Sequence, residues 1–143
     1  MRKFSVVLLD DDGEDMGLLK DSLVVSRLFT VLAICTSYEL LLHVLEDLEE
    51  SPDAIICDIY MEKKDGVAVC RELRLSGRHS GTAFFLITGS EPPTSLILEA
   101  KKNAVRAVFL KPDNADGYDL LAIRLASLLE KGNAASPLLI PFD

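Results

Sequence analysis

Four short apolar runs in this sequence each end at polar residues whose side chains can take part in chemistry. In chain order these polar residues are Asp10, Asp11 and Asp12, then Asp58, Thr88 and Lys111. Carboxylates bind hard metal ions and can act as nucleophiles, whereas a hydroxyl and an ammonium group can contact phosphate oxygens. Any one of these residues is also common in turns, so the chemical interpretation depends on their joint occurrence. Together they indicate a site suited to phosphate chemistry.

The elements that would position these residues alternate between short apolar runs and longer segments of helical period. The predicted strands are Phe4–Leu9, Phe29–Cys35, Ala54–Cys57, Thr82–Ile87 and Val105–Leu110. The predicted helices are Glu14–Arg27, Ser37–Glu50 with Ser37 as its cap, Asp65–Ser76, Pro93–Asn103 and Asn114–Lys131, the last stopping at Gly132. This alternation is typical of an α/β fold with a five-stranded parallel sheet and helices on both faces. Because the carboxyl ends of parallel strands meet at one edge, we expect the polar residues to lie together there.

Length and composition indicate one acidic, globular domain. The 143 residues are 49% hydrophobic, and 15 Lys and Arg against 23 Asp and Glu give a net charge of −8. A negative field repels phosphate backbones, so we expect no direct contact with nucleic acid. No uncharged apolar stretch approaches the ~18 residues needed to cross a bilayer, so we expect no membrane insertion.

The three cysteines and the C-terminal residues complete the predicted organisation. Cys35, Cys57 and Cys70 lie in apolar segments without CxxC spacing, which is typical of reduced core thiols in a cytoplasmic protein. We predict a domain over residues 1–131 and a tail over residues 132–143. Prolines flank the apolar residues of the tail, so we predict that it forms no further element and either docks on the domain or a partner, or is disordered.

Four fragments of the sequence together resemble the receiver domain of two-component response regulators. They are VVLLDDD after the start, IICDIYMEKKDG around Asp58, ITGS around Thr88 and FLKP around Lys111. The resemblance covers roughly residues 4 to 131. Three departures stand out: Glu62 replaces a usual proline, Val108 replaces a usual aromatic residue, and the pair Asn103-Ala104, which is similar to a common Gly-Ala pair, lies one residue too far from the lysine.

The resemblance implies a fold, a reaction and roles for individual residues. The fold would be a flavodoxin-like, doubly wound (βα)5 domain. Asp58 would accept a phosphoryl group from a histidine kinase or phosphotransfer protein, and the modified domain would switch a protein-binding surface for a downstream protein target. The implied ligands of Mg²⁺ are Asp10, Asp11, Asp58 and the main-chain carbonyl of Tyr60. Thr88 would be the switch hydroxyl and Lys111 the amine that contacts the phosphoryl group.

Two alternatives come from different classes of function. The run from Asp10 to Gly13 also fits the DxDG opening of haloacid-dehalogenase-like phosphatases, with Asp10 as nucleophile and Asp12 as general acid. That family needs a further acidic motif on a strand beyond the lysine, whereas the acidic residues that follow Lys111 here lie at the start of the final predicted helix. The phosphatase interpretation would also leave Asp58 without a role. The other alternative is a receiver-like interaction module that is never phosphorylated.

Overall fold

The computed structural model describes residues 2–131 and 139–140. Its strands are β1 (Phe4–Leu9), β2 (Phe29–Cys35), β3 (Ala54–Asp58), β4 (Ala83–Thr88), β5 (Ala107–Leu110) and β6 (Leu139–Ile140). Its helices are the 3-10 turn η1 (Gly13–Met16), α1 (Gly17–Ser26), α2 (Tyr38–Asp47), α3 (Gly66–Ser76), α4 (Thr94–Lys102) and α5 (Ala115–Glu130). None of the helices in these described ranges combines the length and apolar character needed to span a bilayer.

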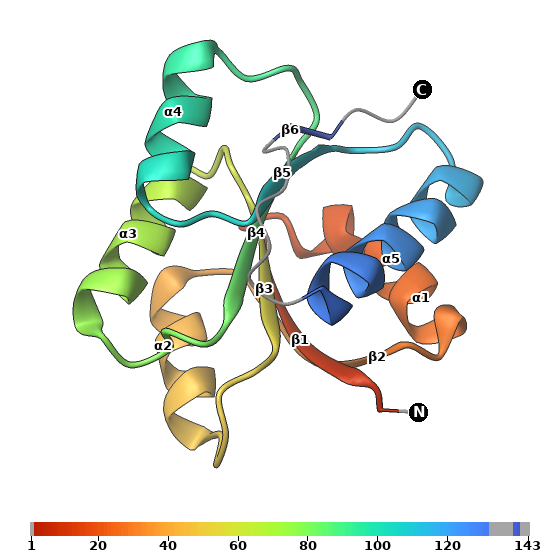
Figure 1. Cartoon of the computed structure of the whole chain (residues 1–143), viewed down its shortest axis with the longest axis horizontal. Helices are drawn as coiled ribbons and strands as arrows, with labels where there is room; N and C mark the ends of the chain where they lie inside the picture. Colours follow the sequence, from red (N-terminus) through yellow and green to blue (C-terminus); the bar gives the residue numbers. More distant parts are fainter. Residues whose placement is uncertain (1, 132–138, 141–143) are drawn as a thin grey trace.

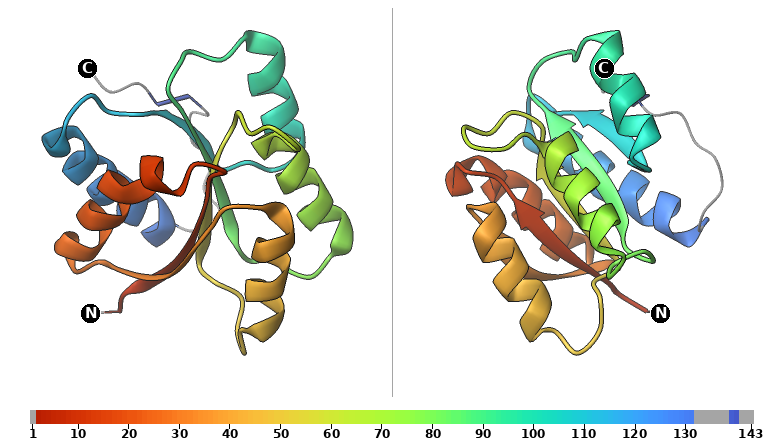
Figure 2. Two further views of the ribbon diagram at one scale, coloured as in Figure 1. Left: turned by 180° about the vertical axis from the view of Figure 1, so that it is seen from behind. Right: turned by 90° about the vertical axis from the view of Figure 1, so that its left-hand side faces the viewer.

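The strands form one parallel sheet in the order β2-β1-β3-β4-β5-β6, which confirms the predicted doubly wound α/β fold. Helices α1 and α5 cover one face of the sheet, and α2, α3 and α4 cover the other (Figures 1 and 2). The chain runs outward from β1 to β2 and then returns to β3 on the other side of β1. The carboxyl ends of β1 and β3 therefore flank the point at which the strand order reverses, where such sheets bind ligands.

The central strands are apolar on both sides because each face of the sheet is buried under helices. All five residues of β3 are buried, and alternate side chains enter two separate cores. Ile56, Phe85 and Phe109 pack on the side of α1 and α5. Phe84 and Val108 pack on the side of α2, α3 and α4. The two cores fix the height and register of β3, β4 and β5, and thereby the positions of the residues at their carboxyl ends.

The tail contains an element that was not predicted, because two of its residues form the sixth strand. Leu139 pairs with Val108 and Ile140 pairs with Phe109, both in parallel register. Without this partner β5 would be an edge strand with unpaired main-chain groups, and an apolar dipeptide can supply those pairings. The sheet is thus extended beyond the five predicted strands. The other tail residues, including the predicted helix stop Gly132, lie outside the described residues.

Side-chain caps define where three of the α-helices begin. The predicted cap Ser37 is confirmed, because its hydroxyl accepts a bond from the Leu40 amide at 3.1 Å at the start of α2. Asp65 and Asn114 cap α3 and α5 in the same manner. The first predicted helix is wrong in one respect: residues Gly13–Met16 form a 3-10 turn, and the α-helix begins only at Gly17, a residue of low helix propensity.

Candidate functional site

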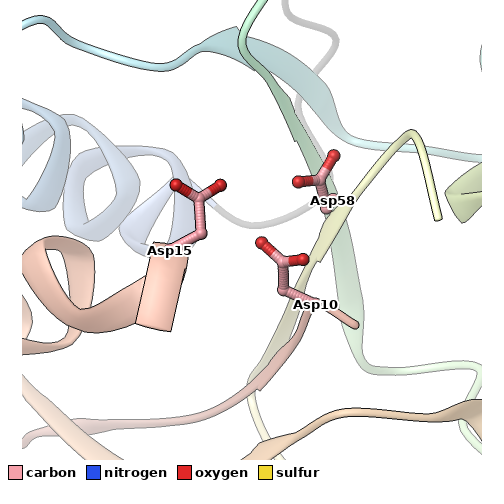
Figure 3. A group of neighbouring side chains, drawn as sticks. All are labelled: Asp10, Asp15 and Asp58. Atoms are coloured by element: carbon pink, nitrogen blue, oxygen red, sulfur yellow. The ribbon is translucent and has the colours of Figure 1, made fainter. Parts of the chain in front are cut away.

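Two buried carboxylates meet at the carboxyl ends of β1 and β3. Asp10 directly follows β1 and Asp58 is the last residue of β3, and the two strands are paired neighbours. Their exposed fractions are 1% and 7%. Together with Asp15 from η1 they form a group in which each residue offers an oxygen within 4.8 Å of the others. Figure 3 shows the three carboxylates converging on one space.

Asp10 has one satisfied and one unsatisfied carboxylate oxygen. Its Oδ1 accepts a hydrogen bond from the Asp12 amide at 2.9 Å. Its Oδ2 is buried without a hydrogen-bond partner among the described residues, and the nearest cation is the Lys111 Nζ at 3.8 Å. Burial raises the pKa of Asp10 to about 7, and the neighbouring charge of Asp58 adds to this effect. An orphaned, buried oxygen of this kind is a place where a hard cation fits.

Asp58 is held by the main chain on one side and by an ammonium group on the other. Its Oδ1 accepts a hydrogen bond from the Tyr60 amide at 3.0 Å, and its Oδ2 accepts one from the Lys111 Nζ at 2.8 Å. Burial alone would lower the pKa of Lys111, but its bonds to Asp15 and Asp58 raise that pKa above the ordinary value. Lys111 is therefore a permanent cation beside the Asp58 carboxylate.

Asp11, which was predicted as a metal ligand, is not one of the three converging carboxylates. The Oδ2 atom of Asp11 accepts a hydrogen bond from the Glu62 amide at 2.9 Å, which ties the loop after β1 to the loop after β3. A proline at position 62 would have no amide hydrogen to donate, so the departure noted in the sequence creates this contact. The main-chain amide of Tyr60 donates a hydrogen bond to Asp58 at the site.

Thr88 ends β4 with its hydroxyl bound to the loop that follows. The side chain is fully buried, and its Oγ1 donates to the Ser90 carbonyl at 3.0 Å and accepts from the Ser90 amide at 3.3 Å. The Lys111 amide donates to the Thr88 carbonyl at 2.7 Å. The hydroxyl is thus one strand away from Asp58, because β3 and β4 are paired, but it is engaged with Ser90.

Gly66 allows α3 to begin directly against the end of β3. A Cβ atom at this position would lie 2.6 Å from the Asp58 carbonyl oxygen and 2.6 Å from the Leu86 Cδ2. The Gly66 amide donates to the Ile59 carbonyl at 2.8 Å and closes the loop that carries Tyr60. A larger residue would push this loop away from the site.

Asp15 belongs to the group and was not predicted from the sequence. Its carboxylate forms an ion pair with Lys111, which also contacts Asp58. The acidic run from Asp10 to Asp15 was the feature of the sequence that could have pointed to this residue. The sequence pattern predicted a regular helix from Glu14, however, and so gave no reason to expect this side chain at the strand ends. The 3-10 turn instead directs the carboxylate toward the strand ends (Figure 3).

The comparisons with known proteins agree with this geometry. Residues 6–121 match the response regulator receiver domain family. A stretch of 73 residues, 51% of this chain, is 33% identical to the protein of Bacillus subtilis (strain 168) named "Probable C4-dicarboxylate response regulator DctR". That stretch spans about a third, 31%, of the length of the curated relative.

Solved structures show the same fold at low sequence identity. The isolated receiver domain of RcsB from Salmonella enterica serovar Typhimurium, determined with the phosphomimetic BeF3⁻, is 14% identical and has a TM-score of 0.76 over 95% of this chain and 94% of that chain. The response regulator domain of CheB from Thermotoga maritima is 19% identical and has a TM-score of 0.71 over 94% of this chain and 100% of that one. With its doubly wound sheet and a family match over most of its length, the chain belongs to the response regulator receiver domain family.

Proposed function

We propose that Asp58 accepts a phosphoryl group from a histidine kinase or a phosphotransfer protein, and that the modified domain presents an altered surface to a downstream protein. The observation that carries this proposal is the contact between the Asp58 Oδ2 and the Lys111 Nζ, 2.8 Å apart at the carboxyl end of the sheet. Asp58 is a buried carboxylate at the end of a central strand, and it accepts a direct hydrogen bond from this permanent cation. The family match supports this role over the alternative in which Asp10 is the nucleophile of a dehalogenase-like phosphatase.

In the proposed reaction a carboxylate oxygen of Asp58 forms a bond to phosphorus. The bond between phosphorus and the donor atom breaks at the same centre, and the donor leaves with the electron pair. Phosphoryl transfer needs mainly positioning and neutralisation of the charge on the phosphoryl oxygens. Lys111 supplies one positive charge for those oxygens, and the Tyr60 amide holds Asp58 in place for attack.

The residues of the site fit a magnesium ion. Carboxylates about 5 Å apart repel one another by roughly 3 kcal/mol per pair at an effective dielectric constant near 20, and oxygen ligands suit Mg²⁺. Asp10 and Asp58 would hold the ion, with the free oxygen of Asp11 and the Tyr60 carbonyl as the further proposed ligands. When bound, the ion neutralises negative charge on the phosphoryl oxygens. The orphaned Oδ2 of Asp10 is the feature of this chain that supports the assignment.

Thr88 would transmit the modification to the loop after β4. Its hydroxyl can donate one hydrogen bond, and in this structure that bond goes to the Ser90 carbonyl. A phosphoryl oxygen on Asp58 would compete for the same hydrogen, so Ser90 would lose its partner when Thr88 turns toward Asp58. The loop leads through residues 89–93 into α4, which would be the first element to respond.

Val108 and Phe109 define how this switch would differ from the usual one. Val108 is buried on the side of α2, α3 and α4 and has no ring that could rotate. Phe109 faces the opposite core and packs against Phe85 with ring centroids 6.0 Å apart. The register between β4 and β5 is continuous, so no bulge redirects Phe109 toward Thr88. We therefore assign the response mainly to Thr88 and α4.

We place the protein in the cytoplasm as part of the same proposal. The three cysteines are free and buried, and burial raises the pKa of both Cys35 and Cys70 to about 11, so their thiols stay protonated and unreactive. This is the behaviour of core thiols in a reducing compartment.

Labelling with acetyl phosphate tests the proposed function. The wild type and the exposed control variant Asp12→Asn should take up a phosphoryl group in the presence of Mg²⁺, whereas Asp58→Asn should not. Undiminished labelling of Asp58→Asn would contradict the proposed role of Asp58. Absence of labelling in the wild type, both with acetyl phosphate and with histidine kinases, would instead indicate an interaction module that is never phosphorylated.

A further inference from the structure

Lys111 is shared among three carboxylates. Its Nζ forms an ion pair with Asp15, donates to the Asp58 Oδ2 at 2.8 Å and lies 3.8 Å from the Asp10 Oδ2. The Lys111 side chain is 16% exposed, so these contacts are made in a partly dry environment in which charges interact more strongly than in water. In this resting arrangement, Asp15 competes with Asp58 for the ammonium group.

The position of Asp15 is fixed by the turn that carries it. The Asp12 carboxylate caps η1 by accepting a hydrogen bond from the Glu14 amide at 3.2 Å. The Asp15 amide donates a hydrogen bond to the Asp12 carbonyl at 3.1 Å. The next residue, Met16, is 1% exposed and anchors the turn in the core beneath α1 and α5. The Asp15 side chain itself is 47% exposed. The turn therefore directs the Asp15 carboxylate toward Lys111, although packing of the core does not require a carboxylate at this position.

We propose that Asp15 is a positioning residue that holds Lys111 in the unphosphorylated site and opposes its contact with the incoming phosphoryl group. The inference rests on the proposed function of Asp58 as phosphoacceptor. A phosphoryl group on Asp58 adds negatively charged oxygens beside Lys111. The ammonium group must leave Asp15 before it can neutralise the charge on these phosphoryl oxygens. The Asp15 charge also repels an anionic donor as it approaches. Asp15 thus makes phosphorylation of the domain less favourable.

The size of the effect follows from the exposure of the ion pair. Loss of a partly exposed ion pair typically changes a binding constant by roughly two- to fivefold. We expect Asp15→Asn to bind beryllofluoride, a phosphoryl mimic, roughly two- to fivefold more tightly at saturating Mg²⁺. Labelling by acetyl phosphate should reach half-saturation at a correspondingly lower donor concentration. Asp15→Glu keeps the charge and should behave like the wild type.

Two measurements test the inference together. The first is the NMR resonance of the Lys111 ammonium group without any ligand, which should differ between the wild type and Asp15→Asn. The second is the affinity for beryllofluoride at saturating Mg²⁺. The matched control is Asp12→Asn, which removes the same charge from an exposed carboxylate on the same turn while its side-chain oxygen can still cap η1. The control should change neither the resonance nor the affinity.

The outcomes separate this inference from the proposed function. An unchanged Lys111 resonance, or an affinity of Asp15→Asn that is equal to or weaker than that of the wild type, would overturn the role of Asp15. Weaker Mg²⁺ binding by Asp15→Asn with an unchanged Lys111 resonance would make Asp15 a metal ligand instead, and would also overturn it. If neither the wild type nor any variant binds beryllofluoride, the proposed function fails and the inference fails with it.

Discussion

Replacing Asp10 by asparagine should stabilise the metal-free protein at neutral to alkaline pH. The carboxyl is 1% exposed, and its Oδ2 has no hydrogen-bond partner among the described residues. In metal-free solution the charged form therefore pays for burial and for repulsion by Asp58. The side-chain oxygen of an asparagine can still accept the bond from the Asp12 amide, so the turn after β1 should keep its shape.

The pKa of Asp10 sets the size and the sign of the effect. This carboxyl ionises near the ordinary value of 3.8 in the unfolded chain and near 7 in the folded chain. Between these values the unfolded chain has lost a proton that the folded chain keeps, so the free energy of unfolding falls by about 1.4 kcal/mol per pH unit and levels off above about pH 7. The whole interval corresponds to roughly 4 kcal/mol. We expect Asp10→Asn to recover roughly 1 to 3 kcal/mol, because its amide has a desolvation cost of its own.

Urea denaturation in EDTA at about pH 5 and about pH 8 measures this effect. The difference between Asp10→Asn and the wild type should be larger at the higher pH. The exposed variant Asp12→Asn is the control and should show no comparable gain. Addition of Mg²⁺ should stabilise the wild type and have much less effect on Asp10→Asn. A stability difference that is the same at both pH values, or an undiminished response of the variant to Mg²⁺, would refute the reasoning.

Three further outcomes follow from the structure. Thr88→Ala removes the hydroxyl that binds the loop after β4, so the NMR shifts that beryllofluoride induces in that loop and in α4 should shrink; equal shifts in both proteins would contradict this route. Gly66→Ala places a Cβ 2.6 Å from the carbonyl oxygen at the end of β3 and should cost roughly 1 to 3 kcal/mol in urea denaturation, whereas Gly17→Ala, with open space around it, should cost nothing. Replacement of both β6 residues by proline should speed hydrogen exchange in β5, and unchanged exchange would show that the tail pairing does not protect that strand.

The parts of the fold that could be predicted are those that depend on local pattern. The apolar runs that end at Asp58, Thr88 and Lys111 predicted the strands. They also predicted that these three residues lie at one edge of the sheet, because the carboxyl ends of parallel strands meet there. Ser37 was recognisable as a cap from its residue type and its place before a helical period. Phe109 could be assigned to the core opposite Val108 from the alternation of a strand alone.

The parts that could not be predicted depend on contacts between distant segments. The direction of Asp15 depends on a 3-10 turn and on Lys111, which lies 96 residues further along the chain. The bond from Glu62 to Asp11 joins two loops across 51 residues. The strand at Leu139–Ile140 is too short to show a period, and it forms only because β5 offers an open edge.

The most direct test of the central claim is to identify the aspartate that becomes phosphorylated. After treatment of the wild type with acetyl phosphate and Mg²⁺, borohydride reduces the acyl phosphate and leaves homoserine at the modified position, which peptide mass spectrometry can locate. The proposed function predicts homoserine at Asp58, and none when Mg²⁺ is withheld. Homoserine at Asp10 would contradict it, because the nucleophile would then be the carboxylate at the end of β1.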